Sequence, residues 1–398
     1  MALHPFITAM LDMLKDAPAL SAGTPGDARA FVAAGRARLG SGPEMHRAEE
    51  RTIEGRGGPI RARLLMPVAR PEGVIVFLHG GGWVVGALED YETYTRTLAQ
   101  RTGLAVLAVD YRLAPEAPYP AGLEDCEDAL AAVLEGRVDG CPAGPVIVMG
   151  DSAGGNLAAV CCARLKDPSA VALQVLYYPV TDHDFDRPSY RAHGTGLPLT
   201  ARDMQWFFGH YAPTSAWADP DVSPLRRTDL AGLPPAIIVT AEYDVLLDEG
   251  EAYADRLAAQ GVPVTRRRVD GVTHGFIRLH PFSTSLMRNC RPFRRKSAIG
   301  SFRADRLHLA KEDIMTISDR QITPDSVLTD RPHGLIIDGK TVPAASGKTF
   351  ATLNPATGRE IAQLAEGHRR TWTAPSPPPA GPSRDRGASG HRRSARRC

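Results

Sequence analysis

Cysteine is scarce in this sequence. The 398 residues include six cysteines, of which Cys161 and Cys162 are adjacent, and no C-x-x-C pair occurs. This spacing does not match a zinc site, and so few cysteines in a chain of this length do not form a disulfide framework. The composition therefore predicts reduced thiols in a cytoplasmic protein without a bound metal.

The chain also lacks an excess of charge and a long apolar run. Its 47 Lys and Arg residues stand against 45 Asp and Glu, a net charge of +2 that gives no signal for nucleic acid or acidic lipid. No uninterrupted apolar run reaches the ~18 residues of a membrane span. The first residues lack a basic segment and carry Asp12 and Asp16, unlike a signal peptide. We therefore expect neither a membrane nor a nucleic acid as partner.

Strand-like and helix-like segments alternate up to about residue 279. The expected strands cover residues 60–66, 74–78, 104–109, 146–149, 171–178, 236–240 and 264–269. The expected helices cover residues 91–101, 123–134, 153–165 and 249–260. Short β-branched runs between amphipathic helices predict an α/β fold, with a mostly parallel central sheet and helices on both faces.

Two segments lie outside this alternation. Residues 1–45 contain amphipathic stretches, and residues 184–225 are rich in aromatic residues and prolines. Binding segments are often insertions on an α/β scaffold, so the two could together cover a pocket. Ordinary packing is the alternative for both.

The segment Gly150-Asp151-Ser152-Ala153-Gly154 follows a strand and precedes a helix. It fits the G-x-S-x-G pattern of a nucleophile held in a strained strand-to-helix turn. The glycines allow close approach of the chain, and the amides at the start of the helix favour developing negative charge. We therefore predict that Ser152 is a nucleophile.

A run of three glycines follows the expected strand at 74–78, in His79-Gly80-Gly81-Gly82-Trp83. Such a run can direct backbone N–H groups into an oxyanion hole. We predict Gly81, Gly82 and Ala153 as the donors. A flexible glycine loop is the alternative, but it explains neither His79 nor the position of the run ahead of the serine turn.

A serine nucleophile needs a base, and the base needs an orienting acid. Asp244 and His274 each follow an expected strand, and open α/β sheets place their sites at the carboxyl ends of strands. The order Ser152, Asp244, His274 is that of an α/β hydrolase. Three other residues are rivals for the acid: Asp248 is assigned to capping the next helix, Glu249 to its first turn, and Asp270 is too near His274 in the chain to face it. The rival for the base, His79, is assigned to bracing the glycine loop.

Five motifs stand in order along the chain: HGGGW at 79–83, DYRLAPEAPYPA at 110–121, GDSAGGN at 150–156, DVLLDEG at 244–250 and HGF at 274–276. Together they resemble the bacterial hormone-sensitive-lipase family of esterases, in the branch that carries GDSAG. The resemblance covers about residues 1–280. It implies an α/β-hydrolase fold with a helical cap, formed by the N-terminal segment and the 184–225 insertion.

The resemblance also implies hydrolysis of short- to medium-chain carboxylic esters, without metal or cofactor. Its site would comprise the triad Ser152, Asp244 and His274 and the oxyanion donors Gly81, Gly82 and Ala153. The expected partner is a small-molecule ester, and a family-like homodimer is compatible with the resemblance. Asp110, Arg112 and Glu116 are expected in internal ion pairs. An amidase or lactonase would use the same triad, and a non-catalytic ligand-binding module of the same fold is the alternative from another class.

The C-terminal third departs from this pattern. Residues 333–367 resemble the N-terminus of an aldehyde dehydrogenase, but no dinucleotide-binding or catalytic domain follows, so we expect no dehydrogenase activity. The predicted segments are cap helices (1–45), a catalytic domain (46–285), a degraded helix and linker (286–332), the dehydrogenase-like fragment (333–367) and a disordered Arg/Pro-rich tail (368–398). Reading-frame shifts around 287–303 and near 368 would explain this order, and the codons there test the idea.

Overall fold

The computed structural model describes residues 2–282 and four short strands at 335–337, 340–342, 349–353 and 360–365. The chain divides into two units, residues 1–302 and 303–398. In the second, β9 (Leu335–Ile337) pairs antiparallel with β10 (Lys340–Val342), and β11 (Thr349–Leu353) with β12 (Glu360–Ala365). The segments 286–332 and 368–398 lie outside the described residues. The resemblance of 333–367 to a dehydrogenase fragment stays a prediction.

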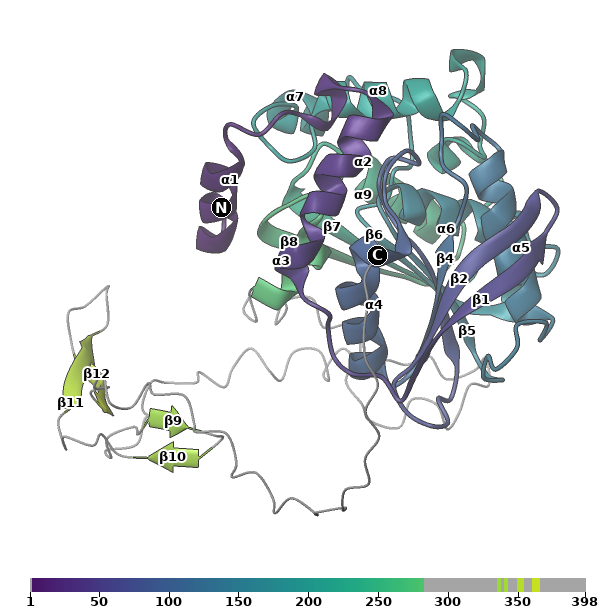
Figure 1. Cartoon of the computed structure of the whole chain (residues 1–398). Helices are drawn as coiled ribbons and strands as arrows, with labels where there is room; N and C mark the ends of the chain where they lie inside the picture. The colour runs from purple at the N-terminus through teal and green to yellow at the C-terminus, as the bar shows by residue number, and fades with distance from the viewer. Residues whose placement is uncertain (1, 283–334, 338–339, 343–348, 354–359, 366–398) are drawn as a thin grey trace, which may run out of the picture. The chain divides into compact units, whose positions relative to one another are not determined.

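An eight-stranded sheet forms the centre of the first unit, in the order β1-β2-β4-β3-β5-β6-β7-β8 (Figure 1). The pairs β1–β2 and β2–β4 are antiparallel, and every other pair is parallel. The strands are β1 (Arg47–Gly55), β2 (Gly58–Met66), β3 (Val74–Leu78), β4 (Ala105–Asp110), β5 (Val146–Asp151), β6 (Val171–Tyr177), β7 (Ala236–Tyr243) and β8 (Val264–Thr273). The predicted mostly parallel sheet is confirmed.

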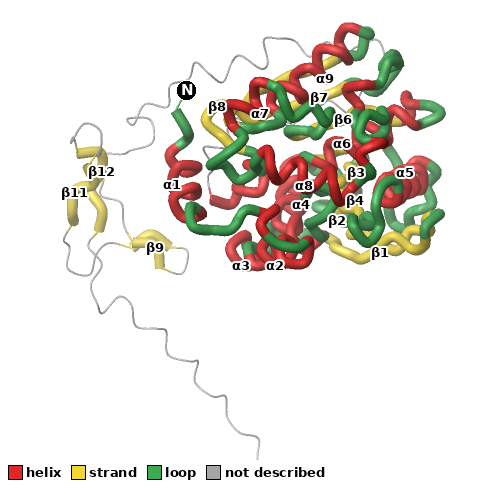
Figure 2. Tube along the Cα trace, turned by 90° about the horizontal axis from the view of Figure 1, so that it is seen from above, coloured by secondary structure: helices red, strands yellow, loops and turns green. Residues whose placement is uncertain are grey.

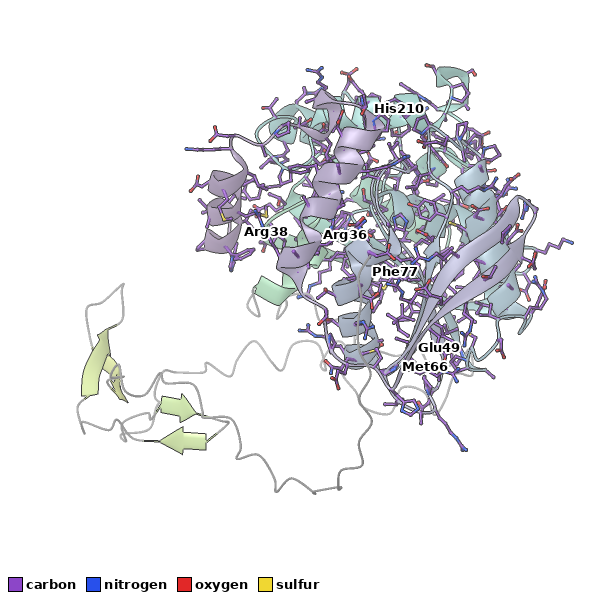
Figure 3. The ribbon with its side chains drawn as sticks, in the orientation of Figure 1. Arg36, Arg38, Glu49, Met66, Phe77 and His210 are labelled. Carbon is purple, nitrogen blue, oxygen red and sulfur yellow. The ribbon has the colours of Figure 1, made fainter. Side chains whose placement is uncertain are left out.

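Helices cover both faces of this sheet. All five side chains of β3 are buried, and they alternate between two hydrophobic clusters because successive strand residues point to opposite faces. One cluster includes α5 (Ala121–Leu134), α6 (Ala153–Arg164) and α9 (Leu247–Ala259), and the other includes α1 (Pro5–Leu14) and α4 (Leu88–Thr102). Phe77 of β3, labelled in Figure 3, lies with its ring centroid 5.7 Å from that of Tyr91 and 5.5 Å from that of Tyr94, both on α4.

The N-terminal segment and the insertion meet each other. The N-terminal segment continues through η1 (Leu20–Ala22), α2 (Pro25–Ala34) and α3 (Arg36–Leu39), and the insertion carries α7 (Pro188–His193) and α8 (Ala201–Tyr211). The backbone N–H of Ser21 donates a buried hydrogen bond of 2.9 Å to Asp203 of α8. In Figure 1 the upper end of α2 lies near α8, and Figure 2 shows α2 and α3 next to each other. No helix in the ranges described is long and apolar enough to cross a bilayer.

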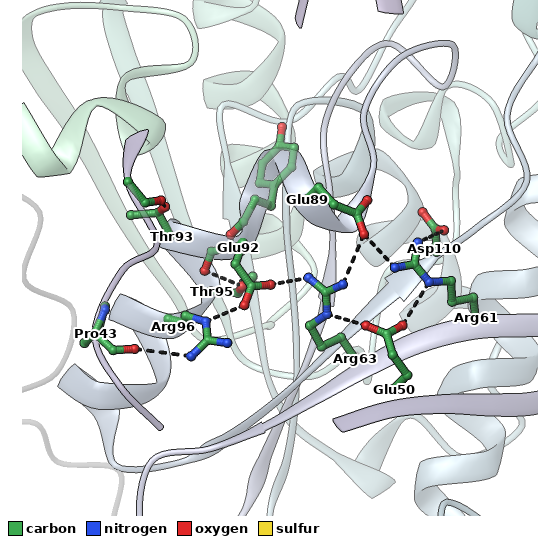
Figure 4. Close-up of polar contacts among 12 residues, drawn as sticks. Pro43, Glu50, Arg61, Arg63, Glu89, Glu92, Thr93, Thr95, Arg96 and Asp110 are labelled. Carbon is green, nitrogen blue, oxygen red and sulfur yellow. Dashed lines mark hydrogen bonds and ion pairs between the residues drawn. The ribbon is translucent and has the colours of Figure 1, made fainter. Parts of the chain in front are cut away.

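Strand β1 was not predicted, because Ile53 is its only buried residue and charged side chains dominate it. Ion pairs fix the β1–β2 ribbon to α4 instead (Figure 4). Arg63 of β2 bonds Glu50 of β1 at 2.6 Å and Glu89 of α4 at 3.1 Å, and it also contacts Glu92. Because the partners of these charged side chains lie on other elements, the sequence of β1 has no apolar periodicity that would predict a strand.

Candidate active site

Ser152 occupies the turn between β5 and α6 in a strained conformation. Its φ of 55° and ψ of −121° lie where few residues other than glycine are found. A Cβ on Gly150 would lie 2.1 Å from the Gly154 carbonyl oxygen, and one on Gly154 would lie 2.0 Å from the Leu78 carbonyl oxygen. Close backbone packing therefore requires both glycines of the G-x-S-x-G pattern, and it places Ser152 at the end of the central strand.

The structure brings Ser152, His274 and Asp244 together from three strand ends. Asp244 follows β7 and His274 follows β8. The His274 Nδ1 lies 2.7 Å from Asp244 Oδ2, and its Nε2 lies 2.9 Å from Ser152 Oγ. A carboxylate only accepts hydrogen bonds, so Nδ1 carries the hydrogen and Nε2 is free to accept one from the serine hydroxyl.

Asp244 is buried, with 1% of its surface exposed. Its second oxygen, Oδ1, accepts a 3.0 Å hydrogen bond from the Leu246 N–H, which fixes the carboxylate towards His274. The prediction that Asp248 caps α9 is wrong, because the N-cap residue of α9 is Leu246 and makes no side-chain cap bond. Asp248 instead accepts a 2.7 Å bond from the N–H of Ser189, in the first turn of α7.

The glycine loop after β3 lies close to this serine turn. Gly81 has φ +127° and Gly82 has φ +58°; a Cβ on Gly81 would lie 2.1 Å from the Val85 carbonyl oxygen. The amides of Gly81, Gly82 and Ala153 donate no hydrogen bond within the described part of the chain. Three such amides beside a buried serine have the chemistry of an oxyanion site.

Asp151 connects the serine turn to the glycine loop, and the sequence reasoning did not identify it. Its carboxylate accepts a 2.8 Å bond from the Gly80 N–H and a 3.1 Å bond from the Tyr91 hydroxyl. Burial raises the pKa of Asp151, although the Gly80 N–H opposes this shift. The available signal was a charged residue at the end of a strand whose residues are otherwise apolar.

Tyr178 is a second residue that the sequence did not indicate. It follows β6, has a positive φ of 34° and is 1% exposed. Its ring centroid lies 4.5 Å from that of His274 and 5.3 Å from that of Phe276. The ring therefore packs directly against the imidazole and limits its rotation.

The alternative base, His79, makes no hydrogen bond to Ser152, whose Oγ lies against His274 instead. Its Nδ1 lies 2.8 Å from the Gly80 carbonyl oxygen, and its ring stacks on Tyr111 with centroids 4.4 Å apart. Burial lowers the pKa of His79, which keeps the ring neutral near pH 7. It thus braces the glycine loop.

The charged residues of the 110–121 motif are in ion pairs, each with a partner outside the motif. Asp110 lies 3.3 Å from Arg61, Arg112 lies 2.8 Å from Asp125, and Glu116 lies 2.6 Å from Arg29. These contacts join the motif to β2, α5 and α2. Within the described ranges, no group of three or more His, Cys, Asp or Glu side chains could hold a metal ion.

The chain resembles known hydrolases over most of its first unit. A model of the alpha/beta hydrolase fold family matches residues 75–278. The carboxylic ester hydrolase LipN of Mycobacterium tuberculosis is 42% identical over 252 residues, which cover 60% of this chain and 66% of that protein. An ethyl acetate hydrolase of Pseudomonas putida is 40% identical over 210 residues, 52% of this chain and 66% of the relative. The chain thus spans just under two thirds of each of these two curated relatives.

Solved structures agree with this resemblance. A hyperthermophilic esterase from the archaeon Pyrobaculum calidifontis superposes with a TM-score of 0.69 and 37% sequence identity. The match covers 73% of this chain and 96% of the esterase. It therefore includes nearly the whole of that protein.

Proposed function

This chain belongs to the alpha/beta hydrolase fold family, and from that premise we propose that it is a serine carboxylesterase. Its substrates are short- to medium-chain carboxylic esters, and it works through an acyl-enzyme intermediate. The observation that carries the proposal is the continuous hydrogen-bonded path from Ser152 through His274 to Asp244. The related proteins named as ester hydrolases support it.

In this mechanism His274 is the general base and then the general acid. Its Nε2 takes the proton of Ser152 as the oxygen attacks the ester carbonyl, and it returns that proton to the leaving alcohol. Asp244 orients the ring and stabilises the imidazolium. Water then attacks the acyl-enzyme by the same route, which releases the acid and frees Ser152.

The developing oxyanion is bound by the amides of Gly81, Gly82 and Ala153. Each lacks another acceptor in the described chain, so these donors are available to the reacting oxygen. Loss of one such donor costs about 3–4 kcal/mol of barrier in comparable enzymes. No metal or organic cofactor takes part in these steps.

The remaining assignments rest on the same resemblance. The protein acts in the cytoplasm on small-molecule esters, and residues 1–45 and 184–225 form the cap over the site. An amidase or lactonase would share the chemistry up to the acyl-enzyme, but the related proteins are named for ester hydrolysis. A non-catalytic binding module would not need the intact path from Ser152 to Asp244.

Hydrolysis of p-nitrophenyl esters from acetate to palmitate tests the proposal, with the full chain compared with its Ser152→Ala variant. We expect activity on the short and medium esters that disappears in the variant, because the variant lacks the attacking oxygen. Equal rates for the two proteins would refute the role of Ser152. Comparable rates on long-chain triglyceride emulsions would contradict the chain-length preference.

A further inference from the structure

Glu249 is a buried acid that the proposed mechanism does not use. It lies in the first turn of α9, five residues after Asp244, and its side chain is fully buried. Its Oε1 accepts hydrogen bonds from the backbone N–H groups of Thr181 at 2.7 Å and Asp182 at 3.2 Å. These two residues lie a few positions after β6, where the chain leaves the sheet towards the insertion.

Further bonds join the same two segments. The Thr181 hydroxyl donates to the Glu249 carbonyl oxygen at 2.8 Å. The Ser189 hydroxyl donates to the Val245 carbonyl oxygen at 2.7 Å, and the Ser189 N–H donates to Asp248. Residues 181–189, at the root of the insertion, are thus bonded at several points to residues 245–249, which directly follow Asp244.

Hydrogen bonds in the segment between Asp244 and Glu249 keep these two residues from moving independently of each other. The Leu247 N–H donates to the Asp244 carbonyl oxygen at 3.2 Å, and the Gly250 N–H donates to the Leu246 carbonyl oxygen at 3.1 Å. One tight turn therefore connects the two carboxyl groups. A displacement of Glu249 would move Asp244, whose Oδ2 lies 2.7 Å from His274.

Charged groups face Glu249 from the insertion side and from its own segment. Asp182 is bonded to Arg187 at 2.6 Å and to Arg226 at 2.7 Å, so its charge is balanced locally. Arg187 stabilises the ionised form of Glu249, whereas Asp182 destabilises it. Burial and the charge of Glu249 raise the pKa of Tyr190. On its own segment the nearest carboxyl groups in sequence are Asp244, bonded to His274, and Asp248, bonded to the Ser189 N–H.

We propose that Glu249 is a positioning residue, whose carboxyl group holds the root of the insertion against the Asp244 turn and so keeps Asp244 directed at His274. The inference rests on the proposed esterase function. It assigns Glu249 no contact with the substrate or the reacting atoms. A glutamine can accept the same two N–H bonds, whereas an alanine cannot.

The protonation state of Glu249 makes this positioning role visible in the pH dependence of the rate. Burial raises the pKa of Glu249 to about 8, although the two N–H bonds oppose this. The group is therefore mainly neutral at pH 7. Above that pKa a negative charge develops in a fully buried site, and the cost of removing this charge from water loosens the junction. The neutral glutamine cannot undergo this change.

The experiment measures kcat and KM for a short p-nitrophenyl ester between pH 6 and 9.5 in the full chain. Three variants are compared with it: Glu249→Gln, Glu249→Ala and the matched control Glu251→Gln, which removes an acid paired with Arg268 outside this junction. We expect Glu249→Ala to lose at least tenfold in kcat, with KM changed less than threefold. Glu249→Gln should keep kcat at pH 7 and lack the fall near pH 8 that the unmodified chain and Glu251→Gln show.

Identical pH profiles for the unmodified chain and Glu249→Gln would overturn the inference, as would an unchanged kcat in Glu249→Ala. If Glu249→Ala does not fold by circular dichroism, the comparison with Glu249→Gln decides alone. The rate of Ser152 labelling by a fluorophosphonate separates this inference from the proposed function, because labelling needs an activated serine but no ester turnover. If no ester is hydrolysed, the esterase assignment fails, and the same pH difference in labelling still decides the role of Glu249.

Discussion

Replacing Asp151 by alanine should damage both stability and catalysis. Asp151 is 2% exposed, and its two oxygens accept bonds from the Gly80 N–H and the Tyr91 hydroxyl. Truncation leaves both donors buried without an acceptor, at about 1–3 kcal/mol each. The expected loss in the free energy of unfolding is therefore roughly 2–6 kcal/mol, a large part of the ~5–15 kcal/mol of a typical domain.

The effect on rate follows from the position of Gly80. It directly precedes Gly81 and Gly82, so its bond to Asp151 sets where the proposed oxyanion donors lie relative to Ser152. Misalignment of one donor corresponds to a loss of roughly 10²–10³ in kcat. We expect KM to change little, because the interaction concerned develops with the oxyanion in the transition state.

Asp151→Asn is the matched control. Its side-chain oxygen can still accept the Gly80 N–H, and the Tyr91 hydroxyl can rotate to accept from the amide. Urea unfolding and steady-state kinetics on the same preparations measure both effects, and Asn should recover most of each. An Asp151→Ala variant within 1 kcal/mol of the unmodified stability and within threefold of its kcat would refute the reasoning, with the 1 kcal/mol limit set by the lower cost of a single orphaned donor.

Two further changes test other parts of the structure. Gly82→Ala should lower kcat by about 10²-fold or more through a displaced oxyanion donor, because its Cβ would lie 2.2 Å from the ring of Phe207. Steady-state kinetics should show partial recovery in a Gly82→Ala, Phe207→Ala double variant, and an unchanged kcat in the single variant would contradict the assignment. For Glu249 the pKa rises from 4.5 to about 8, so the folded state keeps a proton that the unfolded state loses, and stability falls as pH rises through this window. Between pH 4.5 and 9, the unfolding free energy of the unmodified chain should therefore fall by up to roughly 5 kcal/mol relative to that of Glu249→Gln. Urea unfolding at each pH measures both values, and the same pH dependence in the two proteins would exclude the shift.

The parts of the fold with strong local patterns were predictable. Strand β3 was predicted with its observed bounds, because a fully buried strand is a continuous apolar run. Strands β7 and β8 extend further than predicted, to Tyr243 and Thr273, because pairing between them continues through polar residues. Strand β1 was missed for the same reason, since Glu50 of β1 pairs with Arg61 and Arg63 of β2 and the strand has almost no apolar pattern of its own.

In the site, too, the residues with a local sequence pattern were predictable, and those that depend on distant partners were not. The sequence pointed to Ser152, Asp244 and His274 because each follows a strand and carries a recognisable local pattern. Residues that hold them in place have partners distant in sequence, as Asp151 has in Tyr91 of α4. Glu249 had one readable signal: it lies four residues before Tyr253 on the buried face of α9, where a charged side chain is costly without partners.

The aromatic residues of the insertion illustrate why local sequence does not determine the glycine loop. Sequence reasoning left open whether they form a pocket or simply pack. Tyr211 of α8 stacks on Trp83 with centroids 4.1 Å apart and planes 6° apart, and the ring of Phe207 occupies the space beside Gly82. Both contacts press α8 onto the loop that carries the proposed oxyanion donors. The insertion therefore fixes the position of Gly81 and Gly82 by packing across more than a hundred residues of sequence, and a change in α8 should alter catalysis even where it never touches a substrate.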